Sequence, residues 1–153
     1  MVKKNILITG GAGFIGFNLY IKLYKKNKIY ILDYKKKINQ KPFKKNCRFI
    51  YGDIADKNTF KDLIKRKIVF DYIFHFAAET STYISELNPL KCFRTNVLGT
   101  FNLFEYCKKT KPKNLIFSSS MAIYGKNSKK TSEINIPQPI SYYGLSKLNG
   151  EKI

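Results

Sequence analysis

Short apolar runs alternate with amphipathic segments along most of the chain. Runs rich in Ile, Leu, Phe and Tyr predict strands at 5–9, 28–33, 47–53, 70–78 and 113–120. Apolar positions at helical spacing predict helices at 14–26, 56–66 and 89–109, and one more that begins near Ser141. The run at 70–78 is almost continuously apolar, as is typical of a strand buried on both faces. Loops are expected at 79–88 and 121–140.

This order of elements predicts an α/β fold. Strands that alternate with helices need crossover connections, which produce a doubly wound parallel sheet, the Rossmann fold. We expect the spatial strand order 3-2-1-4-5, with a ligand site at the carboxyl ends of the strands, where the order reverses between strands 1 and 4. The final helix reaches Ile153 without a terminating cap, so we expect residues 1–153 to be one truncated domain that lacks later strands.

The formal net charge of +19 raises the alternative of a nucleic-acid-binding surface. Almost all of the basic residues are lysines, however, and they are dispersed through strand edges, helix ends and loops; only Arg48, Arg66 and Arg94 are arginines. Together with abundant Ile and Asn, this distribution is typical of A/T-rich codons. It therefore favours no specific nucleic-acid partner.

The cysteines and the single histidine indicate a protein without a metal site. Cys47, Cys92 and Cys107 are widely spaced, and with His75 alone the chain holds no Cys/His cluster that could bind a metal ion. An odd number of cysteines without framework spacing indicates reduced thiols and a cytoplasmic location. No apolar run is long enough to span a membrane, so no membrane partner is expected.

The stretch "TGGAGFIG" at 9–16 follows the first predicted strand and opens the first predicted helix. It satisfies G-x-G-x-x-G through Gly11, Gly13 and Gly16, and also G-x-x-G-x-x-G through Gly10, Gly13 and Gly16. Such glycines let the backbone turn tightly and approach a pyrophosphate that binds at the helix N-terminus. The context therefore predicts a dinucleotide site.

Asp33 ends the second predicted strand, 20 residues after Gly13. A carboxylate at this point accepts hydrogen bonds from an adenosine ribose and repels a 2′-phosphate, which favours NAD over NADP. Lys35, Lys36 and Lys37 follow closely and weaken this preference.

The stretch "SYYGLSKL" at 141–148 places Tyr143 and Lys147 one helical turn apart, on the same face. The bare pattern allows either a catalytic pair or two surface residues, because lysine is abundant and Tyr24 with Lys28 repeats the spacing. Tyr142 would pair instead with Ser146 and face elsewhere. An ammonium beside a tyrosine favours the phenolate form.

The segments "TGGAGFIG", "ILD", "GDI", "HFAA", "FSSSMAIYG" and "YGLSK", with Asn96 before "VLGT", occur in one order along the chain. In this order they resemble the extended short-chain dehydrogenases/reductases, in their nucleotide-sugar epimerase/dehydratase branch. The resemblance implies that Tyr143 is the catalytic acid/base, that Lys147 holds the nicotinamide ribose, and that Ser120 binds the reacting hydroxyl. Tyr142 stands where the family usually has proline.

The resemblance also implies a set of residues that bind the cofactor NAD. Asp53 would face the adenine amino group, Ile54 the ring, and Ser118 the cofactor, whereas His75 is expected to be a packed strand residue and Ser119 a satisfied hydroxyl. The whole set is Gly10, Gly13, Phe14, Ile15, Gly16, Asp33, Asp53, Ile54, Phe76, Ala77, Ala78, Asn96, Ser118, Tyr143 and Lys147.

The residues after Ser120 bear on the reaction. The family's 4,6-dehydratases carry an acidic pair there, whereas Met121 and Ala122 can move no proton. This favours NAD-dependent epimerisation of a nucleotide sugar through a keto-sugar, like that of UDP-glucose 4-epimerases. The glutamate at position 79, directly after "HFAA", is in contrast similar to what the family's dehydratases carry there.

Two further enzyme hypotheses and one of another class stay open at this point. A dehydratase or a reductase could use the same scaffold, and a fragment that lacks the C-terminal substrate domain could bind dinucleotide without catalysis. The resemblance further implies a homodimer for the full-length protein.

Overall fold

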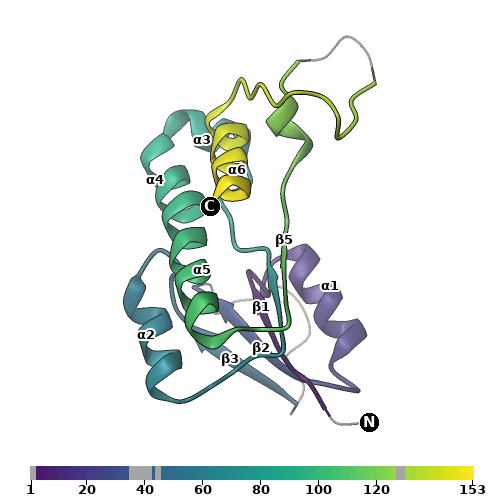
Figure 1. Ribbon diagram of the computed structural model, residues 1–153, viewed down its shortest axis with the longest axis vertical. Helices are drawn as coiled ribbons and strands as arrows, with labels where there is room; N and C mark the ends of the chain where they lie inside the picture. The colour runs from purple at the N-terminus through teal and green to yellow at the C-terminus, as the bar shows by residue number, and fades with distance from the viewer. Residues whose placement is uncertain (1–2, 35–42, 44–45, 127–129) are drawn as a thin grey trace.

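The computed structural model describes residues 3–34, 43, 46–126 and 130–153. Its sheet is parallel throughout, in the order β3-β2-β1-β4-β5, which confirms the expected topology (Figure 1). The lysines at 35–37 lie outside the described residues. The strands are Asn5–Thr9 (β1), Lys28–Asp33 (β2), Cys47–Tyr51 (β3), Tyr72–His75 (β4) and Asn114–Phe117 (β5).

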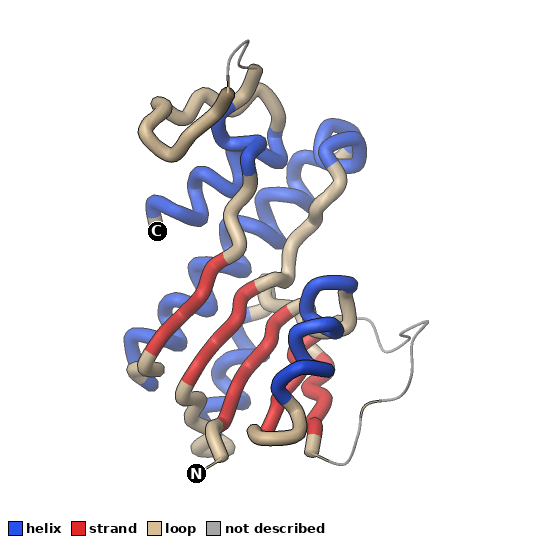
Figure 2. Tube along the Cα trace, turned by 90° about the vertical axis from the view of Figure 1, so that its right-hand side faces the viewer, coloured by secondary structure: helices blue, strands red, loops and turns tan. Residues whose placement is uncertain are grey.

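Helices cover both faces of the sheet (Figure 2). Helix α1 (Phe14–Leu23) covers one face, while α2 (Lys57–Lys65) and α5 (Gly99–Thr110) pack together on the other. Side chains alternate between the faces along each strand. In β1, Ile6 and Ile8 belong to the core under α1, and Leu7 belongs to the core under α2 and α5.

One long helical stretch follows β4 and contains a wide turn. The predicted helix at 89–109 is present as α4 (Pro89–Phe93), the π-helical turn η1 (Arg94–Leu98) and α5. A short helix, α3 (Thr82–Leu87), lies in a segment that was expected to be a loop, because Ser81 caps it by accepting a hydrogen bond from the Ile84 N–H at 3.1 Å. Asn88 caps α4 in the same way through the Lys91 N–H.

The last elements lie beyond the carboxyl ends of the strands. A 3₁₀ turn, η2 (Met121–Tyr124), interrupts the predicted loop after β5, and α6 (Tyr142–Lys152) follows with Ser141 as its N-cap. Helix α6 packs against α3, α4 and η1 (Figure 1). This packing places one face of α6 above the end of β5. None of the helices in the described ranges has the length and apolar character that crossing a bilayer requires.

Candidate active site

The glycine turn joins β1 to α1 at the carboxyl edge of the sheet. Gly10 has φ of +67°, in the region that side chains disfavour, and a Cβ there would lie 2.6 Å from the Ala77 nitrogen. The turn is closed by the Gly13 N–H, which donates to the Gly10 carbonyl at 3.0 Å. A side chain at Gly16 would also collide with that carbonyl, at 2.6 Å. The backbone can therefore adopt this turn only with glycine at Gly10.

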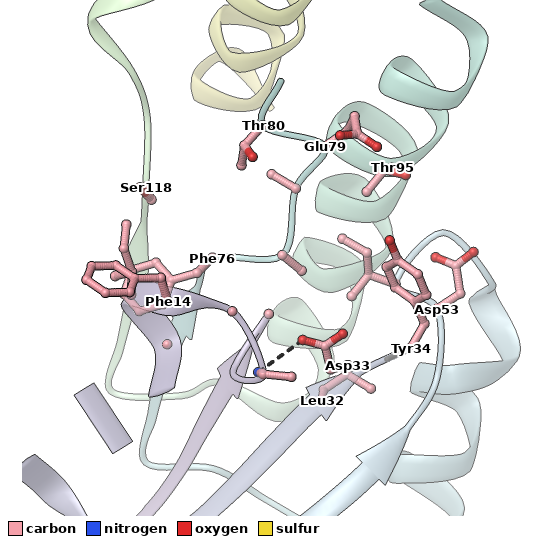
Figure 3. A pocket seen from close by; sticks show the side chains of 18 of the residues that line it. Phe14, Leu32, Asp33, Tyr34, Asp53, Phe76, Glu79, Thr80, Thr95 and Ser118 are labelled. Atoms are coloured by element: carbon pink, nitrogen blue, oxygen red, sulfur yellow. Dashed lines mark hydrogen bonds between the residues drawn. The ribbon is translucent and has the colours of Figure 1, made fainter. Parts of the chain in front are cut away.

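A cavity of about 640 Å³ opens above this turn (Figure 3). Gly10, Gly13 and Gly16 line it, whereas Gly11 packs against the Ile31 side chain, so the 10/13/16 spacing describes the site. Most of the residues expected to bind a cofactor line this one space. They are Gly10, Gly13, Phe14, Ile15, Gly16, Asp33, Asp53, Ile54, Phe76, Ala77, Ala78, Ser118, Tyr143 and Lys147.

Two aspartates lie at one end of the cavity. Asp33 Oδ2 accepts a hydrogen bond from the Ala12 N–H at 3.0 Å, which ties the end of β2 to the glycine turn (Figure 3). Asp53 Oδ1 accepts from the Ala55 N–H at 2.8 Å, and its Oδ2 lies 3.2 Å from the Arg94 guanidinium. Both carboxylates are held in place by the chain itself.

At the other end, α6 presents Tyr143 and Lys147 to the cavity. The Lys147 ammonium donates to the Ser118 carbonyl at 2.8 Å and lies 5.0 Å from the centre of the Phe117 ring. Burial lowers the pKa of Lys147 to about 8. The helix brings its tyrosine and lysine to one face, as the spacing predicts.

The two competing tyrosines lie elsewhere. Tyr142 is 43% exposed, and its ring packs edge-on against Phe93 on α4. Tyr24 caps the far end of α1 and stacks near Tyr20. Neither belongs to the cavity lining.

Asn96 is buried below the cavity and does not line it. Its amide bonds the backbone of Glu79 on both sides, with Oδ1 accepting from the N–H at 2.8 Å and Nδ2 donating to the carbonyl at 3.0 Å. Nδ2 also donates to Ser146 Oγ at 2.8 Å, and Ser146 in turn donates to the Tyr143 carbonyl at 2.7 Å. The structure thus places Asn96 where it connects the loop after β4 to α6, and not in contact with the cavity.

His75 is a packed strand residue, as expected. Its ring is buried between Thr9 Oγ1, at 2.6 Å from Nδ1, and Thr100 Oγ1, at 2.9 Å from Nε2. Thr100 donates its own proton to the Asn96 carbonyl, so Nε2 must be the donor to Thr100, and Nδ1 accepts from Thr9. Burial, reinforced by the nearby Lys147 charge, lowers the pKa of His75 to about 3. A neutral, fully engaged imidazole cannot serve the cavity as a base.

The serines after β5 differ from one another. Ser118 and Ser119 line the cavity, but Ser119 Oγ is buried without a hydrogen-bond partner among the described residues, so the expectation of a satisfied hydroxyl is wrong. Ser120 lies outside the lining. Its Oγ caps η2 by accepting from the Ala122 N–H at 3.2 Å. Because Ser120 accepts in this contact, its proton stays available for donation.

Several cavity residues were not expected from the sequence. Some of them stand inside the quoted segments but were not among the expected site residues, and the others stand outside those segments. Most of them lie at or just after the end of a strand, which is where a doubly wound sheet binds ligands. This position was the available signal. The additional residues are Ala12, Leu32, Tyr34, Gly52, Glu79, Thr80, Thr95 and Ser119.

The charges of the site suit a ligand with distinct ends. The aspartates and Tyr34 gather at one end of the cavity, and Ser118 with Phe14 at the other (Figure 3). The described residues include no group of three or more His, Cys, Asp and Glu that could hold a metal ion. The arrangement offers a helix N-terminus for an anion, and a tyrosine for proton transfer that lines the same cavity as a buried ammonium.

Known proteins resemble this chain over nearly its whole length. The NAD dependent epimerase/dehydratase family matches residues 6–153. UDP-glucose 4-epimerase from Mycoplasma genitalium is 39% identical and is matched over 99% of this chain and 47% of its own.

Solved structures agree with the sequence comparison. UDP-N-acetylglucosamine 4-epimerase from Methanobrevibacter ruminantium, in complex with UDP-N-acetylmuramic acid, matches with a TM-score of 0.88 and 34% identity over 99% of this chain and 49% of that chain. UDP-glucose 4-epimerase from Thermus thermophilus, in complex with NAD, matches with a TM-score of 0.84 and 29% identity over 97% and 49%. The chain thus spans about half the length of the relatives it matches.

Proposed function

Because the chain belongs to the NAD dependent epimerase/dehydratase family, we propose that its cavity binds NAD and serves the epimerisation of a nucleotide sugar. One observation carries the proposal: a single cavity is lined by the glycine turn and Asp33 and also by Tyr143 and Lys147. Cofactor-binding features and an acid/base pair therefore face the same space.

The described residues fit a dinucleotide. The glycine turn leaves no side chain between the backbone and a pyrophosphate at the start of α1, since Gly10, Gly13 and Gly16 all line the cavity there. Asp33 would accept from the adenosine ribose, and Asp53 would lie beside the adenine. The volume of about 640 Å³ falls within the roughly 300–1,000 Å³ of small-molecule sites.

Tyr143 would move the proton. As a phenolate it would take the proton of the reacting sugar hydroxyl, and it would return the proton to the same oxygen once the keto-sugar has turned over. When bound, NAD would supply the acceptor for the hydride of the same carbon and the source of the hydride that returns to the opposite face of the keto-sugar. Atoms and electrons then balance without a net oxidant.

Lys147 and Ser120 would orient these groups. The Lys147 ammonium is fixed by the Ser118 carbonyl, at the cavity end where a nicotinamide ribose would lie. Ser120 would donate its hydroxyl proton to the reacting hydroxyl of the sugar while its Oγ still accepts from the Ala122 N–H. The proposed catalytic residues are therefore Ser120, Tyr143 and Lys147.

A dehydratase is the second candidate, and Glu79 favours it because its carboxylate lines the cavity. Against it stand Met121 and Ala122, which have no group that could protonate a leaving hydroxyl. We propose that most contacts to the sugar and its nucleotide come from outside these 153 residues, since the relatives are about twice as long.

We also propose that the natural protein is a homodimer. Apolar side chains are exposed along the helical stretch after β4, with Leu90 79% and Phe101 46% exposed, and their burial against a second copy would be favourable. Sedimentation analysis tests this, and a monomer at all concentrations would contradict it.

The function is tested by incubating the natural protein with UDP-glucose and following the products by nuclear magnetic resonance. The proposal expects the C4 epimer without net NADH. Loss of water from the sugar would favour the dehydratase, and accumulation of NADH would contradict both candidates.

A further inference from the structure

The carboxylates of the cavity create an electrostatic difficulty for the ligand that we propose. Asp33, Asp53 and Glu79 line it, and Lys147 is the only basic residue in the described lining. With three carboxylates and one ammonium, the described lining residues carry a net negative charge. A dinucleotide brings two phosphate charges of the same sign, so its binding would be opposed.

Two cations outside the lining face these carboxylates. Lys91 Nζ lies 3.1 Å from Glu79 Oε2, and Arg94 lies 3.2 Å from Asp53 Oδ2. Neither cation lines the cavity, and each contacts a carboxylate that does. The contact with Glu79 raises the pKa of Lys91, so its ammonium stays charged at neutral pH.

Lys91 and Arg94 are three residues apart on one helical stretch, at the junction of α4 and η1. This spacing places both side chains on the same face of the stretch, where each reaches a carboxylate that lines the cavity. Their two positive charges balance the excess negative charge of the lining residues. As ion pairs they are half exposed, at 52% and 56%, and such pairs contribute little to folding stability. Their electrostatic effect on a bound anion is a separate quantity.

We propose that Lys91 and Arg94 form a cationic rim that sets the affinity of the cavity for an anionic dinucleotide through charge, without touching the ligand. The inference rests on the proposed function. The two residues mask Glu79 and Asp53, so that these carboxylates can face the cavity without repelling the phosphates.

The test is calorimetric titration of the chain with NAD, AMP and adenosine. Lys91→Gln and Arg94→Gln should each weaken NAD and AMP binding by roughly threefold to tenfold at low salt. Adenosine, which carries no charge, should bind as before. Near 1 M salt, where the screening length falls to about 3 Å, the variants and the parent should converge.

Further variants separate charge from contact and from folding. Lys91→Arg and Arg94→Lys keep the charge and should keep the affinity. Lys108→Gln removes an equal charge from an ion pair with Glu105 on α5, remote from the cavity, and should change nothing. Glu79→Gln combined with Lys91→Gln should restore NAD binding, because the carboxylate that needed masking is gone.

An equal loss with adenosine, a loss that persists at high salt, or the same loss in Lys108→Gln would overturn the inference. Failure of the parent chain to bind NAD at all would contradict the proposed function, and the inference with it. If the parent binds NAD normally and neither Lys91→Gln nor Arg94→Gln changes its affinity, the cationic rim is refuted while the proposed function stands.

Discussion

Asn96 Nδ2 donates a hydrogen bond of 2.8 Å to Ser146 Oγ, and this contact joins the turn η1 to the helix that carries Tyr143 and Lys147. The same amide holds both backbone groups of Glu79. A buried side chain that satisfies three groups at once fixes the loop after β4 relative to α6. The geometry of the cavity therefore depends on a residue that does not line it.

Replacement of Asn96 by alanine should be costly for stability. The substitution leaves the Glu79 N–H and carbonyl without their hydrogen-bond partner, and each buried polar group without a partner costs about 1–3 kcal/mol. We expect the free energy of unfolding to fall by about 2–4 kcal/mol, measured by denaturant titration. Asn102→Ala, which removes one side-chain hydrogen bond to the Ile54 carbonyl from the same helical stretch, is the control and should cost about 1 kcal/mol. Equal losses would argue against the linking role.

Two glycines of the turn should respond differently to alanine. Gly10→Ala combines a positive φ with a Cβ 2.6 Å from the Ala77 backbone, so it should destabilise the fold by more than about 2 kcal/mol. Gly13→Ala meets only the Gly10 carbonyl at 3.2 Å, so it should cost less stability and instead obstruct the ligand. Thermal unfolding and NAD titration of both variants measure the contrast. The prediction fails if Gly13→Ala binds NAD as tightly as the parent.

Asp33→Ala should narrow the preference for NAD over NADP. The substitution removes the ribose acceptor and the charge that repels a 2′-phosphate, and it also frees the Ala12 N–H at 3.0 Å. We expect NAD affinity to fall about tenfold or more, while NADP affinity changes little. Titration with both dinucleotides is the measurement, with Asp62→Ala on the exposed face of α2 as the control. Tighter NADP binding by the parent chain would contradict the assignment.

Lys147 should make stability depend on pH. Its folded pKa of about 8 lies below the ordinary lysine value of about 10.4, so the unfolded chain binds more protons between these values. The contribution of Lys147 to the free energy of unfolding should therefore rise with pH across this window, by about 3 kcal/mol. Lys147→Met cannot titrate, so the free energy of unfolding of the parent should rise relative to that of Lys147→Met between about pH 8 and about pH 10.4. Lys152→Met, at the exposed end of α6, should show no such trend.

The fold could be predicted because its signals are local. The apolar runs, the glycine turn and Asp33 belong to single strands and their ends, and the strand order is the one typical of a doubly wound sheet. The helix α3 was missed because its signal is one capping serine, Ser81, ahead of only six residues.

The candidate site could be predicted only in part, for a physical reason. Residues with a motif, such as Gly10 and Tyr143, line one cavity, and their roles in binding and catalysis stay predictions. The burial of Asn96 depends on how α6 packs against η1, which involves residues 50 positions apart. Pairs such as Glu79 with Lys91 likewise arise only from tertiary packing.

The most direct test compares Tyr143→Phe with Tyr142→Phe in the natural protein, by conversion of a UDP-hexose to its C4 epimer. Both changes remove one hydroxyl from the same helical turn, but only Tyr143 lines the cavity. Tyr143→Phe should leave NAD binding nearly intact and reduce turnover by about 10²–10⁴-fold, as loss of a general acid/base does. Tyr142→Phe should reduce turnover only slightly. Turnover that survives Tyr143→Phe, or equal losses in the two variants, would contradict the account.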